Sequence, residues 1–432
     1  MLNKEENERL TQVGPGTPMG ELMRRYWHPI CAVDELDRTA FRTKEVKVLG
    51  EELVLYRDRS GTLGLLDRYC THRRASLAYG IVEAQGIRCQ YHGWKFDETG
   101  RVLEQPFEDR LHPEAKFRDK CGIRAYKVQE KAGLIFAYMG PSPAPLLPNW
   151  GPLVWENCVR DIATTVLPCS WLQAQENSLD SIHSEHLHEY AGRYFRQILS
   201  GEEPDFKQGR AHTQIGFDVY KYGIIKRRTT VDRGEDHARW AIGHSILFPN
   251  MLWHNAFIQF RVPSDDTHTL HFSLYIWKPA PGTEAPKQDM VPSRVVQLRN
   301  EQGQYSDLNL LFNQDYMCWA TQGEIAHRDL EKLGESDRGI ILFRRMLMEQ
   351  LDIMKEGGEP TINIFRDPME NVGLEYPAIP HEEGEWVGAT FGERGFKYRP
   401  TEGGYSRDAD KIEAVMASWK DFRPAGVWAQ GD

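Results

Sequence analysis

The fold is decided by two short stretches, CTHRRASLAYG (70–80) and CQYHGWKFDETG (89–100). Each begins with a cysteine and has a histidine two or three residues later, which gives the pattern C-x-H…C-x2-H. Cys70, His72, Cys89 and His92 could therefore enclose one metal centre from two loops. Tetrahedral zinc is one alternative, but zinc knuckles usually pair like residues, as in C-x2-C and H-x3–5-H. Here each loop supplies one thiolate and one imidazole.

Two cysteines on one iron and two histidines on the other are the ligands of a Rieske [2Fe–2S] cluster. The two stretches resemble the cluster loops of Rieske non-haem iron oxygenases that attack aromatic rings. The resemblance assigns Cys70 and Cys89 to one iron, and His72 and His92 to the other. Imidazole ligands raise the reduction potential above that of a plant-type ferredoxin. Such a cluster can accept electrons from a reductase and still reduce a nearby iron.

A second group of candidate ligands lies in QENSLDSIHSEHLHEY (175–190). A ferrous iron that activates O2 takes two histidines and one carboxylate, with open positions opposite them. On a regular helix His183 and His186 nearly share a face, whereas His183 and His188 point about 140° apart. Helix geometry alone therefore favours His186 as the partner of His183. A histidine-rich, solvated helix without metal is the alternative.

The same stretch resembles the mononuclear-iron motif N-x2-D-x2-H-x4-H of Rieske oxygenases of the phthalate dioxygenase type. Asn177, Asp180, His183 and His188 occupy the motif positions. The resemblance implies that His183 and His188 bind the iron, so the helix must end or bulge between them. It makes Asp180 a bridging acid, which orients a ligand histidine and contacts the neighbouring subunit's cluster histidine at the position of His92. Asn177 would be a polar neighbour of the iron, and His186 would have a structural role.

The candidate third ligand is Asp315, in LFNQDYMCWATQGEIAHRDLEKLGESD (311–337). This segment resembles the phthalate-type pattern around the carboxylate ligand. It departs from the pattern at Trp319-Ala320, where many relatives have a glutamate nearby. A helix-capping or surface role for Asp315 is the alternative. The other acids available as ligands are Glu185, Asp232, Asp265, Asp266, Glu324 and Asp337.

We predict an α+β fold with two domains. Alternation in KEVKVLGEELVLYRD (44–58) predicts a hairpin around Gly50, and GLIFAYMG (133–140) predicts a strand. The five prolines of PSPAPLLPNWGP (141–152) mark a boundary. Residues 1–140 would form an N-terminal segment and a small all-β Rieske [2Fe–2S] domain. Residues 141–432 would form a larger mixed α/β catalytic domain, with an antiparallel sheet covered by helices and a C-terminal extension.

Four finer predictions concern the second domain. They are a helix over 170–190, strands with turns over 244–277, a helix after Ser336 or Asp337 that ends at Gly357-Gly358, and extended segments from about residue 360. The apolar stripe of the third of these consists of Ile340, Phe343, Leu347, Leu351 and Met354.

The composition of the chain indicates which cell compartment and which kinds of partner to expect. The chain has 432 residues, seven cysteines and a net charge of −10. The acidic balance argues against a nucleic-acid partner. We find no membrane-spanning stretch and no signal-peptide pattern, and the odd, sparse cysteines do not suggest disulfides. We therefore expect a cytoplasmic protein without a membrane partner.

The resemblance implies the oxygenase component of a multi-component enzyme, which uses O2 and electrons from NAD(P)H delivered by a reductase or ferredoxin. Its cofactors would be the [2Fe–2S] cluster and one Fe(II). It also implies a homotrimer or a hexamer of two stacked trimers, because electrons would cross between subunits. The expected substrate is an aromatic acid, with O-demethylation of a methoxylated, lignin-derived biaryl or aromatic carboxylate favoured. Ring cis-dihydroxylation or hydroxylation of a phthalate-like acid is the alternative.

An aromatic carboxylate needs a cation or a hydrogen-bonding fork in its pocket. The candidates are Lys226, Arg227 and Arg228 in YGIIKRRT, and His254, Asn255 and Arg261 in NMLWHNAFIQFRV. Each could instead be a surface or sheet-edge residue. Two other classes of protein remain open from the residues alone. One is an electron-transfer or iron-sensing protein with a degenerate second iron site, and the other is a zinc-binding interaction module.

Overall fold

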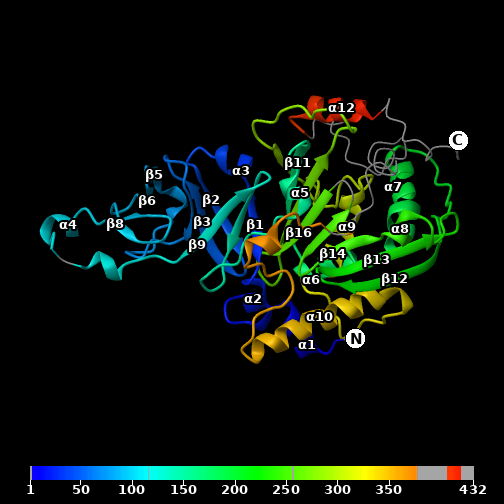
Figure 1. Ribbon diagram of the computed structural model, residues 1–432, viewed down its shortest axis with the longest axis horizontal. Coiled ribbons are helices and arrows are strands. Elements are labelled where there is room, and N and C mark those ends of the chain that lie inside the picture. Colours follow the sequence, from blue (N-terminus) through cyan, green and yellow to red (C-terminus); the bar gives the residue numbers. More distant parts are fainter. Residues whose placement is uncertain (1, 115, 255–256, 376, 378–405, 420–432) are drawn as a thin grey trace.

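The computed structural model describes residues 2–114, 116–254, 257–375, 377 and 406–419. The N-terminal strands lie at one end of the long axis, and a larger sheet with its helices lies at the other (Figure 1). This arrangement confirms the predicted α+β class, with a small β part followed by a larger mixed part.

The N-terminal part contains two antiparallel sheets. The six-stranded sheet has the order β1-β10-β9-β4-β3-β2, and the four-stranded sheet has the order β5-β6-β7-β8. Their strands are β1 (Trp27–Ala32), β2 (Thr43–Val48), β3 (Glu51–Arg57), β4 (Leu63–Asp67), β5 (Ile81–Glu83), β6 (Gly86–Arg88), β7 (Lys95–Phe96), β8 (Val102–Glu104), β9 (Ala125–Lys131) and β10 (Leu134–Tyr138).

The predicted hairpin around Gly50 is confirmed. β2 pairs with β3 so that Val48 lies opposite Glu51. The two turn residues, Leu49 and Gly50, have φ values of 50° and 76°. Positive φ at both central positions is the requirement of the tight turn that suits twisted strands, and glycine meets it without strain.

One eight-stranded sheet organises the second part, in the order β12-β13-β14-β15-β16-β17-β11-β18. Its pairs are antiparallel except β11 with β18. The strands are β11 (Val159–Leu167), β12 (His212–Tyr220), β13 (Gly223–Thr230), β14 (His244–Leu247), β15 (Met251–His254), β16 (Phe257–Pro263), β17 (Thr269–Trp277) and β18 (Ser293–Val295). The strands and turns predicted over 244–277 are confirmed.

The two faces of this sheet differ in chemistry. Because side chains alternate along a strand, Ile258, Phe260 and Val262 share one face of β16, and Leu274 follows them on β17. This apolar face packs against the N-terminal sheet, where the rings of Phe136 and Phe260 lie 5.8 Å apart. The opposite face carries polar side chains and looks toward the helices.

Helices cover the polar face and the edges of the sheet. The helices are α1 (Lys4–Thr11), α2 (Pro18–Met23), α3 (Val33–Asp37), α4 (Glu108–Leu111), α5 (Gly151–Val154), α6 (Trp171–Asn177), α7 (Gly192–Leu199), α8 (Ala238–Ala241), α9 (Leu311–Thr321), α10 (Arg338–Lys355) and α12 (Ala409–Ser418), the π-helix η3 (Ser184–Ala191), and the 3-10 turns η1 (Leu77–Tyr79), η2 (Arg118–Lys120), η4 (Glu335–Asp337) and η5 (Pro368–Asn371). No helix in the described ranges combines the length and the apolar character needed to cross a bilayer.

The predicted helix after Asp337 is confirmed as α10, which buries Phe343, Leu347 and Leu351. The prediction of extended chain from about residue 360 is wrong at α12, whose Ile412 and Val415 pack against β11 and β17. Residues 376, 378–405 and 420–432 of that segment lie outside the described residues.

The division after residue 140 remains a prediction, although each sheet of the described chain lies on one side of it. The N-terminal helices nevertheless contact the second part. The indole of Trp171 in α6 donates to the Leu10 carbonyl (3.3 Å), and the Asn7 amide donates to the Ala326 carbonyl (3.0 Å).

Candidate metal centres

Two loops bring Cys70, His72, Cys89 and His92 together at the end of the N-terminal part. The first loop follows β4, and the second joins β6 to β7. Both cysteines are buried, whereas both histidines are exposed, with ring centroids 4.5 Å apart. The thiols therefore lie on the inner side of the group and the imidazoles on the outer side.

Backbone and aromatic contacts hold the second loop in shape. The Cys89 amide donates to the Trp94 carbonyl (2.8 Å), and the Gly93 amide donates back to the Cys89 carbonyl (3.0 Å). Gly93 has a φ of 78°, and a Cβ there would lie 3.0 Å from Pro106, so glycine suits this turn. The Trp94 ring stacks on His72 with centroids 4.6 Å apart. Trp94 is a supporting residue that the pattern of cysteines and histidines did not indicate.

The second centre begins where α6 ends at Asn177. Residues 178–182 form turns and a bend, His183 has helical backbone angles, and the π-helix η3 then runs from Ser184 to Ala191. Its hydrogen bonds join residues five apart, so side chains at that spacing lie on one side. The predicted break or bulge between His183 and His188 is thus confirmed, and the two rings lie 5.0 Å apart.

His183, His188 and Asp315 form a compact group of possible metal ligands, with one donor atom of each residue within 4.8 Å of the others. Asp315 lies on α9, and its Oδ1 is 3.4 Å from Nε2 of His188 and 3.8 Å from Nε2 of His183. This oxygen is buried, and no hydrogen bond reaches it from the described residues. Burial lowers the pKa of His188, which favours the neutral imidazole that a metal needs.

Asp180 lies behind this group and contacts His183. Its Oδ2 is 3.5 Å from Nδ1 of His183, and its Oδ1 accepts from the Ile182 amide (2.7 Å). Burial alone would raise the pKa of Asp180. The close approach and charge of His183, together with the charge of Lys226, outweigh this and lower that pKa to about 2. Asp180 is therefore a carboxylate at neutral pH.

Gln314 supports the group and was not predicted. Its Oε1 lies 3.0 Å from Nδ1 of His188, and its Nε2 donates to the Leu308 carbonyl (2.7 Å). The contact turns Nε2 of His188 toward Asp315. The sequence carried no signal for it, because 126 residues separate the partners.

The other predicted site residues differ in where they lie. Asn177 ends α6, and its carbonyl accepts from the Asp180 amide (3.1 Å). His186 projects outward with 60% of its side chain exposed. Arg227 lies on the opposite sheet face and pairs with Asp218 (2.5 Å). Asn255 and the side chain of His254 lie outside the described residues.

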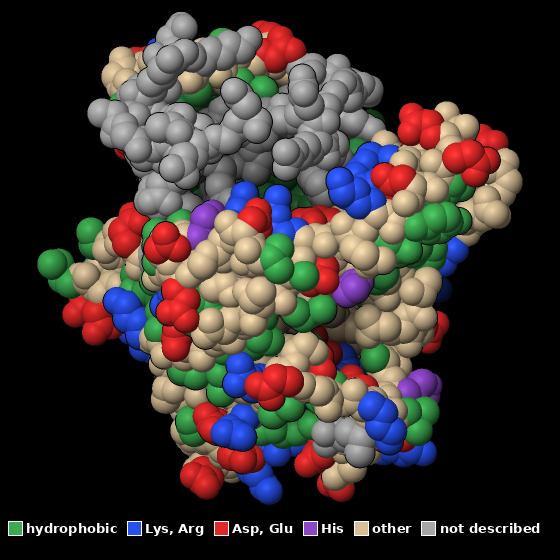
Figure 2. Space-filling view, turned by 90° about the vertical axis from the view of Figure 1, so that its right-hand side faces the viewer, with side chains coloured by type: hydrophobic (Ala, Val, Ile, Leu, Met, Phe, Trp, Pro, Cys, Tyr) green, Lys and Arg blue, Asp and Glu red, His purple; other side chains and the backbone are tan. Residues whose placement is uncertain are grey.

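Lys226, Arg228 and Arg261 are all buried on the polar face of the sheet. Lys226 donates to the Asp180 carbonyl (2.8 Å), and Arg228 donates to the hydroxyl of Ser184 (2.7 Å). Arg261 donates from Nη2 to Gln259 (2.5 Å), while its buried Nε and Nη1 have no hydrogen-bond partner among the described residues. On the described surface of this end of the molecule, charges of both signs are interspersed (Figure 2). The cluster of Lys226, Arg228 and Arg261 is therefore buried and is not part of a positively charged surface patch.

Comparisons with known proteins agree on one family. Residues 26–125 match the Rieske [2Fe-2S] domain family, and residues 293–391 match the family described as LigXa C-terminal domain like. The 5,5'-dehydrodivanillate O-demethylase oxygenase subunit of Sphingobium sp. is 42% identical over 390 residues, covering 90% of this chain and 89% of that protein. The phthalate 4,5-dioxygenase oxygenase subunit of Pseudomonas putida is 31% identical, covering 89% and 94%. The chain belongs to the Rieske non-haem iron oxygenases.

Solved structures agree with this family at the level of fold. The structure of NdmA from Pseudomonas putida CBB5 superposes with a TM-score of 0.58 at 20% identity, covering 80% of this chain and 96% of that chain. As a Rieske oxygenase, the chain uses a [2Fe–2S] cluster and a mononuclear iron as cofactors. The zinc-binding module is therefore wrong, and an enzyme is the correct class.

Proposed function

We propose that this Rieske oxygenase oxidises an aromatic carboxylate, by O-demethylation of a methoxylated, lignin-derived biaryl or aromatic acid. The observation that carries the proposal is the group of buried cations around the triad of His183, His188 and Asp315. The charges that act most strongly on Lys226 are those of Arg228 and Arg261, which lower its pKa, and those of Asp180 and Asp315, which raise it. A ferrous ion would add further positive charge, so an anionic substrate would balance the site.

The pairing of neighbouring strands places the cations Lys226 and Arg261 on the same face of the sheet. Lys226 lies opposite His244, Arg261 opposite His271, and Gln259 opposite Ser273, so these residues alternate onto one face. A buried sheet face is usually apolar. A polar one beside the triad suits a ring with a carboxylate, which a guanidinium can bind through two hydrogen bonds. The similarity to the dehydrodivanillate O-demethylase subunit supports demethylation.

We further propose His183, His188 and Asp315 as the iron ligands, and Cys70, Cys89, His72 and His92 as the cluster ligands. The three donors of the first set fit the facial arrangement of a non-haem ferrous iron. When bound, the iron supplies O2 activation and the cluster supplies electrons. Asp180 orients His183, and Gln314 orients His188. The buried cations would hold the substrate carboxylate, and beside them Ala174 of α6 packs in one buried cluster with Tyr316 and Trp319 of α9.

The assembly and partners follow from the family resemblance. We propose a cytoplasmic homotrimer or a stack of two trimers, in which Asp180 of one subunit meets His92 of the next. The partners would be an NAD(P)H-dependent reductase or ferredoxin. Sedimentation of the purified protein would distinguish three subunits from six, and a monomer that turns over substrate would contradict the proposal.

The proposed reaction can be tested with protein purified without oxygen. Iron and sulfide would be measured first, followed by coupled NADH and O2 consumption with methoxylated and dicarboxylated aromatic acids and a generic reductase. Formaldehyde release would identify demethylation. A cis-diol would identify the second candidate, ring dihydroxylation, which the similarity to the phthalate 4,5-dioxygenase subunit favours. Full iron content without O2 uptake on any aromatic acid would contradict both.

Replacing Arg261 by methionine is expected to raise KM for an aromatic acid about 30- to 100-fold, because a charged hydrogen bond contributes about 2.0–2.7 kcal/mol. The value of kcat should change little. Arg160→Met is the matched control, since Arg160 lies on the apolar face of the same sheet and donates to the Pro152 carbonyl (3.0 Å). Equal KM values for the acid in R261M and the wild type would contradict a role in carboxylate binding.

The efficiency kcat/KM for an aromatic acid is expected to fall about tenfold between pH 6 and pH 8. Burial, reinforced by the charge of Arg228, lowers the pKa of Lys226 to about 7. Lys226 is therefore mostly charged at pH 6 and mostly neutral at pH 8, while the substrate carboxylate stays ionised. In Lys226→Met, kcat/KM should no longer depend on pH and should stay at the low value that the wild type has at pH 8. An unchanged profile in K226M would show that another group titrates.

A further inference from the structure

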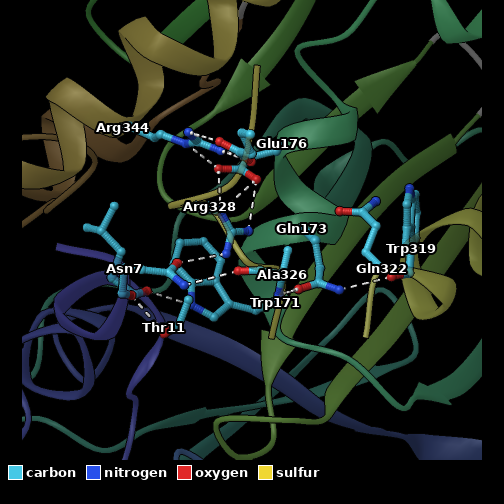
Figure 3. Close-up of polar contacts among 12 residues, drawn as sticks. Asn7, Thr11, Trp171, Gln173, Glu176, Trp319, Gln322, Ala326, Arg328 and Arg344 are labelled. Carbon is cyan, nitrogen blue, oxygen red and sulfur yellow. Dashed lines mark hydrogen bonds and ion pairs between the residues drawn. The ribbon is translucent and has the colours of Figure 1, made fainter. Parts of the chain in front are cut away.

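The helix α6 leads directly into the segment that carries Asp180 and His183. Two of its buried side chains, Gln173 and Glu176, are three residues apart and therefore share a face. Figure 3 shows both of them directed into a network of polar contacts with segments from distant parts of the chain. These contacts decide where α6 lies relative to α9, the helix that carries Asp315.

Gln173 joins α6 to the C-terminal end of α9. Its Nε2 donates to the carbonyls of Trp319 (2.9 Å) and Gly323 (2.8 Å), and its Oε1 accepts from the Ala326 amide (2.8 Å). Trp319 lies in the last turn of α9, where carbonyls have few partners within the helix, and Gly323 follows the helix directly. Trp319 lies one turn beyond Asp315 on α9. One side chain thus ties the helix of Asp315 to the helix that leads to His183.

The other end of α9 is tied to the π-helix. Gln314, next to Asp315, contacts Nδ1 of His188 at 3.0 Å. Two contacts therefore set the position of Asp315 on α9: one with Gln173 of α6, which leads to His183, and one with His188 itself. Between these contacts Asp315 lies 3.4 Å from His188 and 3.8 Å from His183.

Glu176, one turn further along the same face, ties α6 to other segments. It accepts from Arg328 (2.8 Å) and from Arg344 of α10 (2.6 Å), and Arg344 also pairs with Glu331 (2.8 Å). Arg328 donates onward to Asn7 of α1 (3.0 Å). Because these groups are buried and mutually paired, α6 cannot shift along its axis without leaving charges unpaired. Gln173 is thus mounted on a fixed helix.

We propose that Gln173 is a positioning residue of the mononuclear iron site, which acts by fixing α9, and with it Asp315, against the segment of His183. The proposal rests on the iron ligands proposed above. A metal site needs its donors held within about 0.5 Å of the productive geometry. Residues that hold ligands through one further contact typically change metal affinity 10- to 100-fold when replaced.

The test uses the full-length holoenzyme and Gln173→Met, which keeps the length of the side chain and removes its hydrogen bonds. Gln350→Met is the matched control. Gln350 is also a buried helical glutamine, on α10. Its Nε2 donates to Oγ1 of Thr361 (3.2 Å), and its Oε1 accepts from the backbone amide of Thr361 (2.8 Å). The readouts are the visible spectrum of the cluster, the iron affinity of the mononuclear site, and the electron paramagnetic resonance spectrum of its complex with nitric oxide. None of them needs a substrate.

Q173M is expected to keep the cluster spectrum, to bind the mononuclear iron about tenfold more weakly, and to show a shifted nitrosyl spectrum. Q350M should lose stability but keep the wild-type affinity and spectrum. Gln173→Glu, which keeps the acceptor for Ala326 but not the two donors, is the second variant if Q173M does not fold, and the same shift is expected. Wild-type affinity and spectrum in the folded variant would overturn the proposal. A wild type that forms no nitrosyl complex would instead overturn the ligand assignment.

Discussion

Replacing His188 by alanine is expected to abolish O2 uptake coupled to substrate while leaving the cluster spectrum unchanged. The substitution removes one of three donors around the proposed iron, and the buried ring it removes also holds Gln314. We expect the affinity of the mononuclear site for iron to fall at least about 100-fold. The cluster should persist because its four candidate ligands lie on two loops of the N-terminal part. Iron and sulfide analysis with the visible spectrum would measure both effects.

His186→Ala is the control for this prediction. His186 lies two residues away in the same π-helix, but its side chain is largely exposed, and its Nε2 is 3.7 Å from Glu185. Turnover in H186A should stay within about twofold of the wild type, as for most exposed positions. If H186A lost the iron and H188A kept it, the ligand set would be wrong.

The choice between these two histidines shows where periodicity is insufficient. A regular helix places His183 and His186 on one face, and only a local change in the hydrogen-bond pattern brings His188 round. The motif predicted that change, and the structure provides it as a π-helix. The local sequence gives the spacing of the two histidines. Whether their segment forms an α-helix or a π-helix depends on its contacts with α9 and the sheet.

Alternation predicted that residues of β13 divide between two faces, but not which residues face the site. Lys226 and Arg228 face it, whereas Arg227 pairs with Asp218 on the other side. Which residues of β13 face the site is decided by the rest of the sheet, because the apolar face of β16 and β17 must pack against the N-terminal sheet.

Gln314 and Gln173 were not predicted, because their partners lie in segments distant in sequence. The helix α12 was missed, although Ile412 and Val415 have helical spacing, because neighbouring glycines and prolines dominated the segment.

Replacing Asp180 by asparagine is expected to lower turnover about 100-fold, mainly through kcat, with the cluster and the iron both retained. The carboxylate accepts from the Ile182 amide and faces Nδ1 of His183, so it favours a proton on that nitrogen and leaves Nε2 free toward Asp315. An amide nitrogen in its place would donate to Nδ1 and favour the opposite tautomer. Re-oxidation of the chemically reduced cluster under O2 and substrate would measure the effect.

Asp265→Asn is a closely matched control, because Asp265 contacts His268 three residues later (3.0 Å) and accepts from the Thr267 amide (2.9 Å). Burial would raise the pKa of Asp265, but Lys47 and these hydrogen bonds lower it to about 2, as for Asp180. Both carboxylates stay ionised until the pH falls toward 2, so the deficit of D180N should be constant from pH 6 to 8. D265N should turn over within about twofold of the wild type. Equal losses in the two variants would show that Asp180 contributes only to general stability.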